Sequence, residues 1–565
     1  MANFSQPHIC HCLTRLSTSR RNSIVTTDGN RKKTGEEFVG DVLSLASGLL
    51  DLGLRNSDIV AICAFNSDWY LVWLLAVAFV GAIVAPLNYR WSFEEAKSAM
   101  LSVKPVLLVS DESCGFWGLD FQSDAIPSLK WHVFLNSFSS GFEKASNIIT
   151  TEMLRRNGIR SPTLDYTWAP EGAALICFTS GTTGKPKGVL ISHSALIVQS
   201  LAKVAIVGYC EDDVYLHTTP LCHIGGLSSA MAMLMVGASH VLIRKFEAKL
   251  ALEVIERHCV TSLITVPTMM GDLISLTRAD KTSKGRQTVK RILNGGGSLP
   301  VGLIKDASEV FPRAKLLSAY GMTESCSSLT FVTFYDPTSE TPGQHLHSYD
   351  VTKSRPVNQP QGVCVGKPAP HVELKICSNG SSDIGKILTR GPHAMLRYCD
   401  HNSLKTLDNA NKVWLDTGDI GCIDNTGNLW LVGRTNNRIK SGGENVHPEE
   451  VEAILTQHPG VASVLVLGIP DPRLTEIVVA CIKLAQGWQW SDKKCNSHSE
   501  NELLLCSQTL QNHCRERNLS GFKVPKLFIV WRKPFPLTTT GKIRRDGIRR
   551  EVISHLQCLP YFHLS

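Results

Sequence analysis

The stretch TSGTTGKPKG, from Thr179 to Gly188, decides the fold of this chain. It follows the strand-like run ALICF and precedes the helix-like run SHSALIVQSLAKVAI. Its glycines let backbone N–H groups approach phosphate oxygens closely, its hydroxyls can donate to those oxygens, and its lysines neutralise their charge. The pattern therefore predicts a loop that binds a triphosphate. The residues expected to do so are Thr179, Ser180, Gly181, Thr182, Thr183, Gly184, Lys185 and Lys187.

Two other interpretations apply to glycine-rich stretches of this kind. It is not a Walker A loop, because Gly181 and Gly184 lie too close together and proline follows Lys185 where a serine or threonine would bind Mg²⁺. Taken alone, it also fits a flexible turn rich in glycine, serine and threonine. Motifs elsewhere in the chain are needed to distinguish a flexible turn from a phosphate loop.

The chain around this loop predicts an α/β protein with two parts. From about residue 34 to 435, strand-length apolar runs alternate with amphipathic helical stretches, which is typical of parallel or mixed sheets with flanking helices. After Gly433 the apolar pattern is rebuilt in a compact stretch of about 130 residues, enough for a small domain. We therefore expect a large N-terminal domain over residues 1–433 and a small mobile α+β domain over residues 434–565. The clearest strand runs are residues 59–65, 106–110, 174–178, 240–244 and 262–266.

Composition narrows the function further. At 565 residues the chain exceeds a single hydrophobic core, and its 43% hydrophobic and 19% charged residues are typical of a globular protein. A net charge of +8 is small for this length, so nucleic acid is not implied, whereas anionic small molecules are compatible. The 18 cysteines lack paired spacing, which indicates a reducing compartment.

The stretch from Trp69 to Leu87 raises the question of a membrane anchor. It contains 19 residues without a charge, which satisfies the length of a membrane span. However, Gly81 stands where a helix would end, β-branched residues and Pro86 follow, and neither flank carries a cluster of lysines or arginines. We expect a buried helix, a turn and a buried strand, and keep the membrane protein as the alternative.

The two ends of the chain give weak targeting signals. The first 27 residues lack Asp and Glu and contain arginines and serines, a composition resembling a transit peptide. The C-terminal tripeptide ending at Ser565 reads His-Leu-Ser, which is not the Ser-Lys-Leu peroxisomal signal. Residues 335–361 and 486–500 are polar stretches that we interpret as insertions.

Seven pieces of sequence resemble, in order, the acyl-adenylate-forming superfamily of acyl-CoA synthetases, luciferases and peptide-synthetase adenylation domains. This resemblance extends from the phosphate loop almost to the C-terminus. It implies that ATP and Mg²⁺ are used to adenylate a carboxylic acid. The pieces are TSGTTGKPKG, PLCHIGGL (220–227), GGGSLP (295–300), AYGMTES (319–325), WLDTGDIG (414–421), GRTNNRIKSGGENVHPEEVE (433–452) and PLTTTGKIRR (536–545).

The resemblance assigns roles in nucleotide binding. Tyr320 is expected to stack on adenine, and Glu324 to hold Mg²⁺ against the phosphates, a task that needs a hard oxygen ligand. Asp419 is expected to accept hydrogen bonds from both ribose hydroxyls, which suits an ionised acceptor. Without the resemblance, these residues would be ordinary loop and turn residues. Further nucleotide contacts are expected from Gly295, Gly296, Gly321 and Thr323.

The C-terminal pieces imply a domain that rotates between two half-reactions. Arg434 is expected to contact ribose or phosphate, and Asn436 occupies the hinge position where Asp or Lys is usual in the family. Lys542 matches the lysine that stabilises the adenylation transition state, although in isolation it would fit a surface lysine in a basic tail. After rotation, Lys440 would face the adenylate, and Gly443 would leave room for the pantetheine arm of coenzyme A.

Within the superfamily, the pieces YGMTESCS and SGGENVHPEEVE resemble the 2-succinylbenzoate–CoA ligases of menaquinone and phylloquinone synthesis, especially those of plants. The resemblance implies a keto dicarboxylate substrate, coenzyme A as acceptor, and a location in the chloroplast or peroxisome. His223 is a candidate catalytic or substrate-lining residue, and a packing histidine is the equally good alternative. Other candidate functions are an acyl-CoA synthetase for aromatic, hydroxycinnamic or medium-chain acids, and an adenylating enzyme that does not use coenzyme A.

Overall fold

The computed structural model divides the chain into two compact units. Unit 1 comprises Met1–Tyr349, Pro368–Glu373 and Arg390–Leu415, and unit 2 comprises Asp350–Lys367, Leu374–Thr389 and Asp416–Ser565. The predicted domain start at Arg434 lies within unit 2 and stays a prediction. The structure describes residues 6–111, 114, 125–135, 148–157, 164–179, 186–279, 285–339, 362–378, 383–399, 414–434, 439–441, 444–471, 474–491, 503–517, 519, 521–537 and 543–557.

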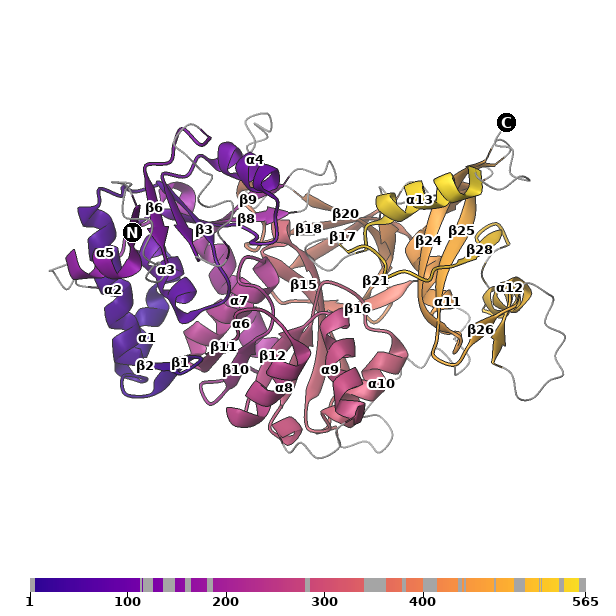
Figure 1. Ribbon diagram of the computed structural model, residues 1–565, viewed down its shortest axis with the longest axis horizontal. Helices are drawn as coiled ribbons and strands as arrows, with labels where there is room; N and C mark the ends of the chain where they lie inside the picture. Colours follow the sequence, from indigo (N-terminus) through magenta and orange to yellow (C-terminus); the bar gives the residue numbers. More distant parts are fainter. Residues whose placement is uncertain are drawn as a thin grey trace. The chain divides into compact units, whose positions relative to one another are not determined.

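Unit 1 contains an eight-stranded sheet in the order β19-β9-β8-β4-β3-β5-β6-β7 (Figure 1). The strands from β8 to β7 along this order run parallel, while β9 and β19 are antiparallel to their neighbours. The predicted strands over residues 59–65, 106–110 and 174–178 are confirmed. The bounds are β3 (Ile59–Cys63), β4 (Ile83–Pro86), β5 (Leu107–Ser110), β6 (Trp131–Phe134), β7 (Ile148–Thr150), β8 (Ala173–Thr179), β9 (Lys187–Ser192) and β19 (Arg397–Tyr398).

A second sheet in unit 1 follows the order β15-β14-β13-β12-β10-β11-β1-β2. Its strands from β14 to β1 run parallel, and the carboxyl ends of parallel strands meet at one edge of a sheet, where α/β proteins bind ligands. The bounds are β1 (Ile24–Asp28), β2 (Arg31–Thr34), β10 (Val214–His217), β11 (Ser239–Leu242), β12 (Ser262–Thr265), β13 (Arg291–Asn294), β14 (Lys315–Met322) and β15 (Ser327–Tyr335). The helices α8 (Ala248–Arg257), α9 (Pro267–Ala279) and α10 (Val301–Val310) pack side by side near these strands (Figure 1).

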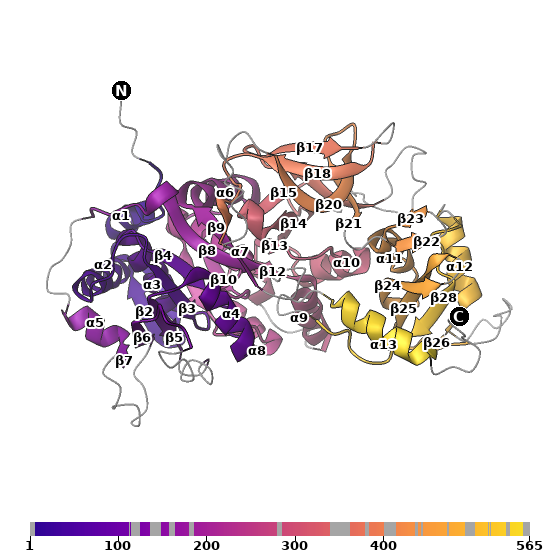
Figure 2. The same ribbon diagram turned by 90° about the horizontal axis from the view of Figure 1, so that it is seen from above.

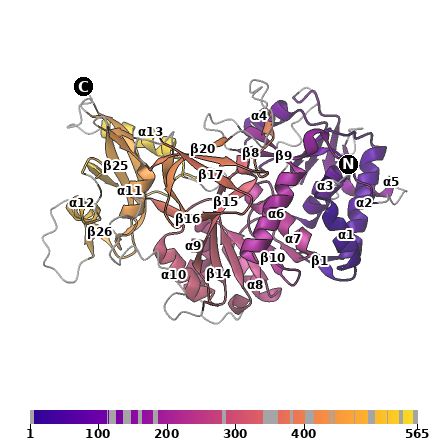
Figure 3. The same cartoon turned by 180° about the vertical axis from the view of Figure 1, so that it is seen from behind.

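Two helices connect the sheets of unit 1. Helices α6 (His193–Val207) and α7 (Ile224–Val236) pack against each other (Figure 3). Helix α6 contacts β8 and β9 of the first sheet and β15 of the second, and α7 contacts β10, β11 and β15. Ser192 caps the start of α6, since its hydroxyl accepts the N–H of Ala195 at 3.1 Å. The buried residues of α6 therefore lie between elements of both sheets.

The apolar stretch from Trp69 to Leu87 forms helix α3 (Asp68–Phe79), a turn and strand β4, as expected. Gly81 has a φ of +75°, a left-handed conformation that glycine adopts readily, and every residue of the helix except Trp69 is buried. Within the described ranges, none of the helices combines the length and the apolarity that a bilayer crossing would need.

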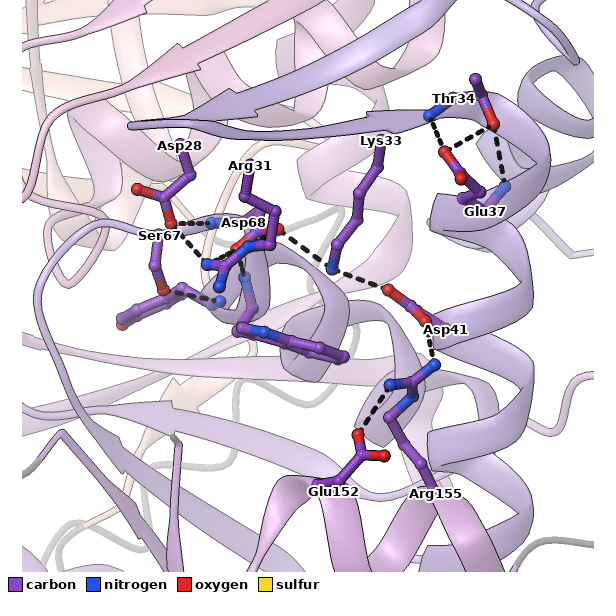
Figure 4. A network of polar contacts seen from close by, with 12 residues as sticks. Asp28, Arg31, Lys33, Thr34, Glu37, Asp41, Ser67, Asp68, Glu152 and Arg155 are labelled. Atoms are coloured by element: carbon purple, nitrogen blue, oxygen red, sulfur yellow. Dashed lines mark hydrogen bonds and ion pairs between the residues drawn. The ribbon is translucent and has the colours of Figure 1, made fainter. Parts of the chain in front are cut away.

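A buried carboxylate fixes the start of α3 (Figure 4). The Asp68 side chain is 1% exposed, and it accepts hydrogen bonds from Arg31 Nε at 2.8 Å while its Oδ2 lies 3.0 Å from Lys33 Nζ. Lys33 also lies 2.6 Å from Asp41 on helix α2 (Gly35–Asp51). Burial alone would raise the pKa of Asp68, but the hydrogen bonds and charges of Arg31 and Lys33 outweigh it and hold this pKa below its usual range.

The described residues of unit 2 form three groups of strands, the smallest of which pairs β26 (Gln489–Trp490) with β27 (Leu504–Leu505) (Figure 2). The first has the order β17-β18-β20-β21-β16, and the second has the order β23-β22-β25-β24 with β28 beside β25. An ion pair links the start of α13 to α11, since Arg545 Nη1 lies 2.6 Å from the half-buried Glu452. The bounds are β16 (Val363–Pro368), β17 (Glu373–Cys377), β18 (Gly385–Arg390), β20 (Leu415–Ile423), β21 (Leu429–Arg434), β22 (Ile439–Ser441), β23 (Glu444–Val446), β24 (Val461–Asp471), β25 (Thr475–Leu484), β28 (Leu527–Val530), α11 (Pro448–Leu455), α12 (Ser507–Glu516) and α13 (Arg545–Gln557).

Replacing Asp68 by alanine is expected to destabilise unit 1 strongly. The change leaves the charges of Arg31 and Lys33 without their shared buried carboxylate, and breaking a buried ion pair from one side costs about 3–5 kcal/mol. Urea unfolding of Asp68→Ala should show the loss, whereas Asp51→Ala, at the exposed end of α2, should change the free energy of unfolding by less than about 0.5 kcal/mol. Equal midpoints for the two variants would contradict the role of Asp68.

Candidate active site

The phosphate-loop segment starts and ends at neighbouring points of the first sheet. Thr179, the last residue of β8, is the cross-strand partner of Lys187, the first residue of β9. The helix predicted over SHSALIVQSLAKVAI is confirmed as α6, and strand β9, which was not predicted, lies between the loop and this helix. The expected phosphate contacts Ser180, Gly181, Thr182, Thr183, Gly184 and Lys185 lie outside the described residues.

Glu324 lies close to the strands β8 and β9 that flank this loop in unit 1. Its carboxylate accepts a hydrogen bond from the hydroxyl of Tyr398 at 2.9 Å, and its carbonyl accepts the N–H of Met395 at 2.8 Å. Lys187 Nζ lies 5.9 Å from the ring centroid of the same Tyr398. The structure therefore gathers Glu324, Tyr398 and Lys187 in one place. The sequence analysis missed Tyr398, because nothing in its local sequence indicates a contact with a residue 74 positions earlier.

A tight turn between β14 and β15 positions Glu324. A Cβ atom on Gly321 would stand 1.6 Å from the carbonyl oxygen of Ser327, so the two backbone segments meet at a point that only glycine permits. Cys326 and Ser327 take positive φ values of 54° and 109° to complete the reversal. Tyr320 is half-buried on β14, opposite Thr330 of β15. Thr323 opens the short 3₁₀ turn η4 (Thr323–Ser325), which also contains Glu324.

Gln199 on α6 anchors this turn from behind. Its Nε2 donates to the carbonyl oxygens of Ser325 at 3.1 Å and Ser328 at 2.6 Å, on either side of the residues with positive φ. The side chain of Gln199 is fully buried. These bonds satisfy backbone carbonyls that the irregular turn leaves outside the β ladder. Gln199 is a second residue that the sequence analysis missed.

The glycine loop after β13 lies at the same sheet edge as the end of β14. The N–H of Gly295 donates to the Thr265 carbonyl at 2.9 Å, and Gly296 has a φ of +72°. Asn294 links the loop to the neighbouring strand, since its side-chain amide donates to Gly297 O at 2.9 Å and to Ser318 Oγ at 3.3 Å. Gly296 is exposed. The backbone N–H groups of this loop are thus held near the end of β14.

His223 stands at the N-terminus of α7, half-buried. Its N–H donates to the Pro220 carbonyl at 3.2 Å, and the loop before it is fixed by Asn66, which accepts the N–H of Leu221 at 2.8 Å. The close packing continues at Gly226, where a Cβ atom would stand 2.5 Å from Pro220 O. The structure therefore gives His223 a rigid support. The two roles considered for His223, packing and substrate contact, stay predictions.

Asp419 and Arg434 lie opposite each other in unit 2. They are cross-strand partners on β20 and β21, and Arg434 Nε lies 3.0 Å from an oxygen of Asp419. Asp419 is 5% exposed, while the Arg434 side chain is 51% exposed and can reach a further anion. A buried carboxylate held by one arginine retains lone pairs for further donors. Such a pair suits the binding of a ribose or a phosphate.

The remaining expected residues belong to the C-terminal pieces. Lys440 lies on β22, where its backbone is paired with Asn445 of β23, but its side chain is outside the described residues. Asn436, Gly443 and Lys542 also lie outside the described residues. Their roles therefore stay predictions.

In chemical terms, the described part of unit 1 offers a site for a metal ion with phosphates. Glu324 supplies a hard carboxylate oxygen that a hydrogen bond from Tyr398 orients, and Lys187 places a cation 5.9 Å from the ring centroid of the same tyrosine. Mg²⁺ usually binds one or two protein carboxylates and completes its shell with phosphate oxygens and waters, so this donor set fits the ion.

Comparison with known proteins gives a consistent result across the chain. Residues 14–399 match the AMP-binding enzymes, and residues 450–542 match the C-terminal domain of AMP-binding enzymes. The chain is 59% identical over 567 residues, covering 99% of both chains, to the chloroplastic/peroxisomal 2-succinylbenzoate–CoA ligase of Arabidopsis thaliana.

Solved structures agree with the sequence comparison. The chain resembles the o-succinylbenzoate CoA synthetase of Bacillus subtilis in complex with its acyl-adenylate intermediate, with a TM-score of 0.71, 25% identity and coverage of 96% of this chain and 98% of that one. It also resembles the same synthetase in complex with ATP and a magnesium ion, with a TM-score of 0.73, 25% identity and coverage of 96% and 99%.

Two neighbouring glycines at the start of α7 should respond oppositely to alanine. Gly226→Ala places a Cβ atom 2.5 Å from the Pro220 carbonyl, so the backbone that carries His223 must shift, and we expect a loss of more than about 1 kcal/mol. A Cβ atom on Gly225 meets nothing within 4 Å, so Gly225→Ala should stabilise the helix by about 0.4–1 kcal/mol. Thermal unfolding of both variants measures the difference, and shifts of the same sign would refute this account.

Proposed function

Since the chain belongs to the family of AMP-binding enzymes, we propose that it is a 2-succinylbenzoate–CoA ligase. It adenylates 2-succinylbenzoate with ATP and transfers the acyl group to coenzyme A, which gives 2-succinylbenzoyl-CoA, AMP and pyrophosphate. The observation that carries this proposal is the 59% identity to the Arabidopsis ligase over 99% of both chains. The structural likeness to the bacterial synthetase with its acyl-adenylate supports the same reaction.

ATP, Mg²⁺ and coenzyme A are the small molecules that this reaction needs. We assign Glu324 as the protein ligand of the magnesium ion, oriented by Tyr398. The bound ion neutralises negative charge on the triphosphate. Lys187, at the end of the phosphate loop, adds a further cation near the same carboxylate.

We assign the nucleotide contacts residue by residue, as the family resemblance implies. In unit 1, Tyr320 stacks on the adenine, and Gly321 permits the tight turn beside it. In unit 2, Asp419 accepts the ribose hydroxyls, and the exposed guanidinium of Arg434 contacts ribose or phosphate. Further backbone contacts come from Gly295, Gly296 and Thr323, which lie on loops at the carboxyl ends of parallel strands.

The two half-reactions use different residues of the C-terminal pieces. Lys542 stabilises the charge that develops between the attacking carboxylate and the α-phosphate. Rotation at Asn436 then withdraws it and presents the segment with Lys440 and Gly443 to the adenylate, so that the coenzyme A thiolate attacks the mixed anhydride. His223, at the rigid start of α7, lines the acid pocket.

The product belongs to phylloquinone and menaquinone biosynthesis, since 2-succinylbenzoate–CoA ligases act there. The name of the Arabidopsis relative places that protein in the chloroplast and the peroxisome. We assign this chain to the same two compartments.

A mixture of candidate acids tests the substrate. Purified enzyme with ATP, Mg²⁺ and coenzyme A should form one main thioester, 2-succinylbenzoyl-CoA, from a mixture that also contains a hydroxycinnamic acid, a benzoic acid and a medium-chain fatty acid. The mass of the thioester identifies the acid that was used. A main product from the fatty acid would refute the proposed substrate, and an adenylate without any thioester would refute the use of coenzyme A.

Lys542→Ala should separate the two half-reactions. Adenylation, measured as release of pyrophosphate, should fall by about two orders of magnitude because an oriented charge is lost from the transition state. Thioester formation from the pre-made acyl-adenylate should persist. Lys533→Ala is the matched control, since Lys533 is 74% exposed and lies in the same C-terminal segment. An equal fall in both half-reactions would show that Lys542 has another role.

A further inference from the structure

A lysine is buried where three elements of unit 1 meet. Lys203 on α6 is fully buried. Its ammonium group donates to the hydroxyls of Ser228 at 2.6 Å, Ser229 at 3.0 Å and Ser327 at 3.4 Å. Ser228 and Ser229 lie on α7, and Ser327 begins β15. The ammonium group therefore joins the first half of α7 to the strand that follows the Glu324 turn.

Among the described residues, no carboxylate pairs with the charge of Lys203. Within the part of the chain that the structure describes, its ammonium group contacts three hydroxyls and no carboxylate. The nearby Cys326 does not compensate the charge, because burial raises the pKa of this thiol to about 12 and keeps it neutral. Burial also lowers the pKa of Lys203 to about 7. Lys33 forms a contrast, since this buried lysine contacts two carboxylates.

The cluster lies directly behind both segments predicted to bind substrates. On one side, the Ser228 hydroxyl donates to the carbonyl of Gly225 at 3.4 Å, and a Cβ atom on Gly225 would meet open space. On the other side, Gln199, one turn before Lys203 on α6, donates to the carbonyl of Ser325. The ammonium group is thus a short distance in the fold from the start of α7 and from the nucleotide turn.

We propose that Lys203, with its three serine hydroxyls, binds the carboxylate of the acid substrate that is not adenylated. This assignment rests on the proposed function. 2-Succinylbenzoate has one carboxylate on the ring and one at the end of the succinyl chain, and only one of them enters the adenylate. The other stays ionised through both half-reactions, and an ionised carboxylate in an interior site needs a cation.

The serine shell suits this role. Each hydroxyl accepts a hydrogen bond from the ammonium group, and the Ser228 hydroxyl in turn donates to the carbonyl of Gly225. A carboxylate that approaches Lys203 therefore meets a cation that three hydroxyls hold in place. An acid without the second carboxylate would leave the buried ammonium unpaired, so this site selects for dicarboxylates.

The first arm of the experiment compares three acids with the full-length enzyme. These are 2-succinylbenzoate, 4-oxo-4-phenylbutanoate, which lacks the ring carboxylate, and 2-butanoylbenzoate, which lacks the succinyl carboxylate. The analogue that forms a thioester identifies the carboxyl group that is adenylated. Its kcat/KM should lie about 100-fold below that of 2-succinylbenzoate, because a buried charge has lost its partner.

The second arm uses Lys203→Met, which keeps the length of the side chain without its charge. We expect kcat/KM for 2-succinylbenzoate to fall about 100-fold, while kcat/KM for the productive analogue changes less than about threefold. Gln199→Met is the matched control, since Gln199 is buried on the same helix and supports the same turn. This control should lower kcat/KM for both acids by a similar factor.

Two outcomes would overturn the assignment. If Lys203→Met lowers kcat/KM for both acids equally, Lys203 only positions the turn. If the wild-type enzyme makes no thioester from 2-succinylbenzoate but does from another acid, the proposed function fails, and this assignment fails with it. If Lys203→Met does not fold, Ser228→Ala decides, with an expected loss of about threefold to tenfold for 2-succinylbenzoate alone. An equal loss for both acids in Ser228→Ala would again refute the proposal.

Discussion

The contact between Gly321 and the carbonyl of Ser327 is the constraint on which the site in unit 1 depends. A single Cβ atom at position 321 would stand 1.6 Å from that oxygen, so β14 and β15 can approach this closely only through glycine. The chain then reverses within η4, and Glu324 projects from the turn toward Tyr398. A wider loop would leave this carboxylate without a defined direction.

Helix α6 converts this local turn into part of the global fold. It contacts strands of both sheets of unit 1, and its buried face carries Gln199 and Lys203. Gln199 binds backbone carbonyls of the turn, and Lys203 binds hydroxyls of α7 and β15. The same helix follows the phosphate loop by one strand. Strands β8 and β9, helix α7 and the Glu324 turn therefore share one support.

The sequence predicted those helices, turns and strands whose formation depends on residues close together in the chain. The stretch from Trp69 to Leu87 was assigned to a helix, a turn and a strand because Gly81 interrupts an apolar run, and the structure has this arrangement. The α/β class followed from alternating periods in the same way. Strand β9 was missed, since VLIS after the phosphate loop is too short to separate a strand from the first turn of a helix.

The contacts that support the site could not be predicted from sequence. Tyr398 reaches Glu324 over 74 positions, and Gln199 reaches Ser325 over 126 positions. Neither residue belongs to a motif or interrupts a pattern, because a tyrosine in a short strand and a glutamine in a helix are ordinary there. Family motifs record the groups that touch substrates, whereas the residues that hold those groups are determined by the packing of distant elements.

The pairing of buried charges separates structural from functional polar groups in unit 1. Lys33 is balanced by Asp41 and Asp68, so its network is complete within the fold and fixes the start of α3. Among the described residues, the ammonium group of Lys203 contacts three hydroxyls and no carboxylate, and an apolar side chain of similar length would avoid the unfavourable burial of its charge. Local conflicts of this kind are expected at functional sites, where a ligand completes the interaction. On this argument, the charge of Lys203 fits the proposed contact with the carboxylate of the acid that is not adenylated.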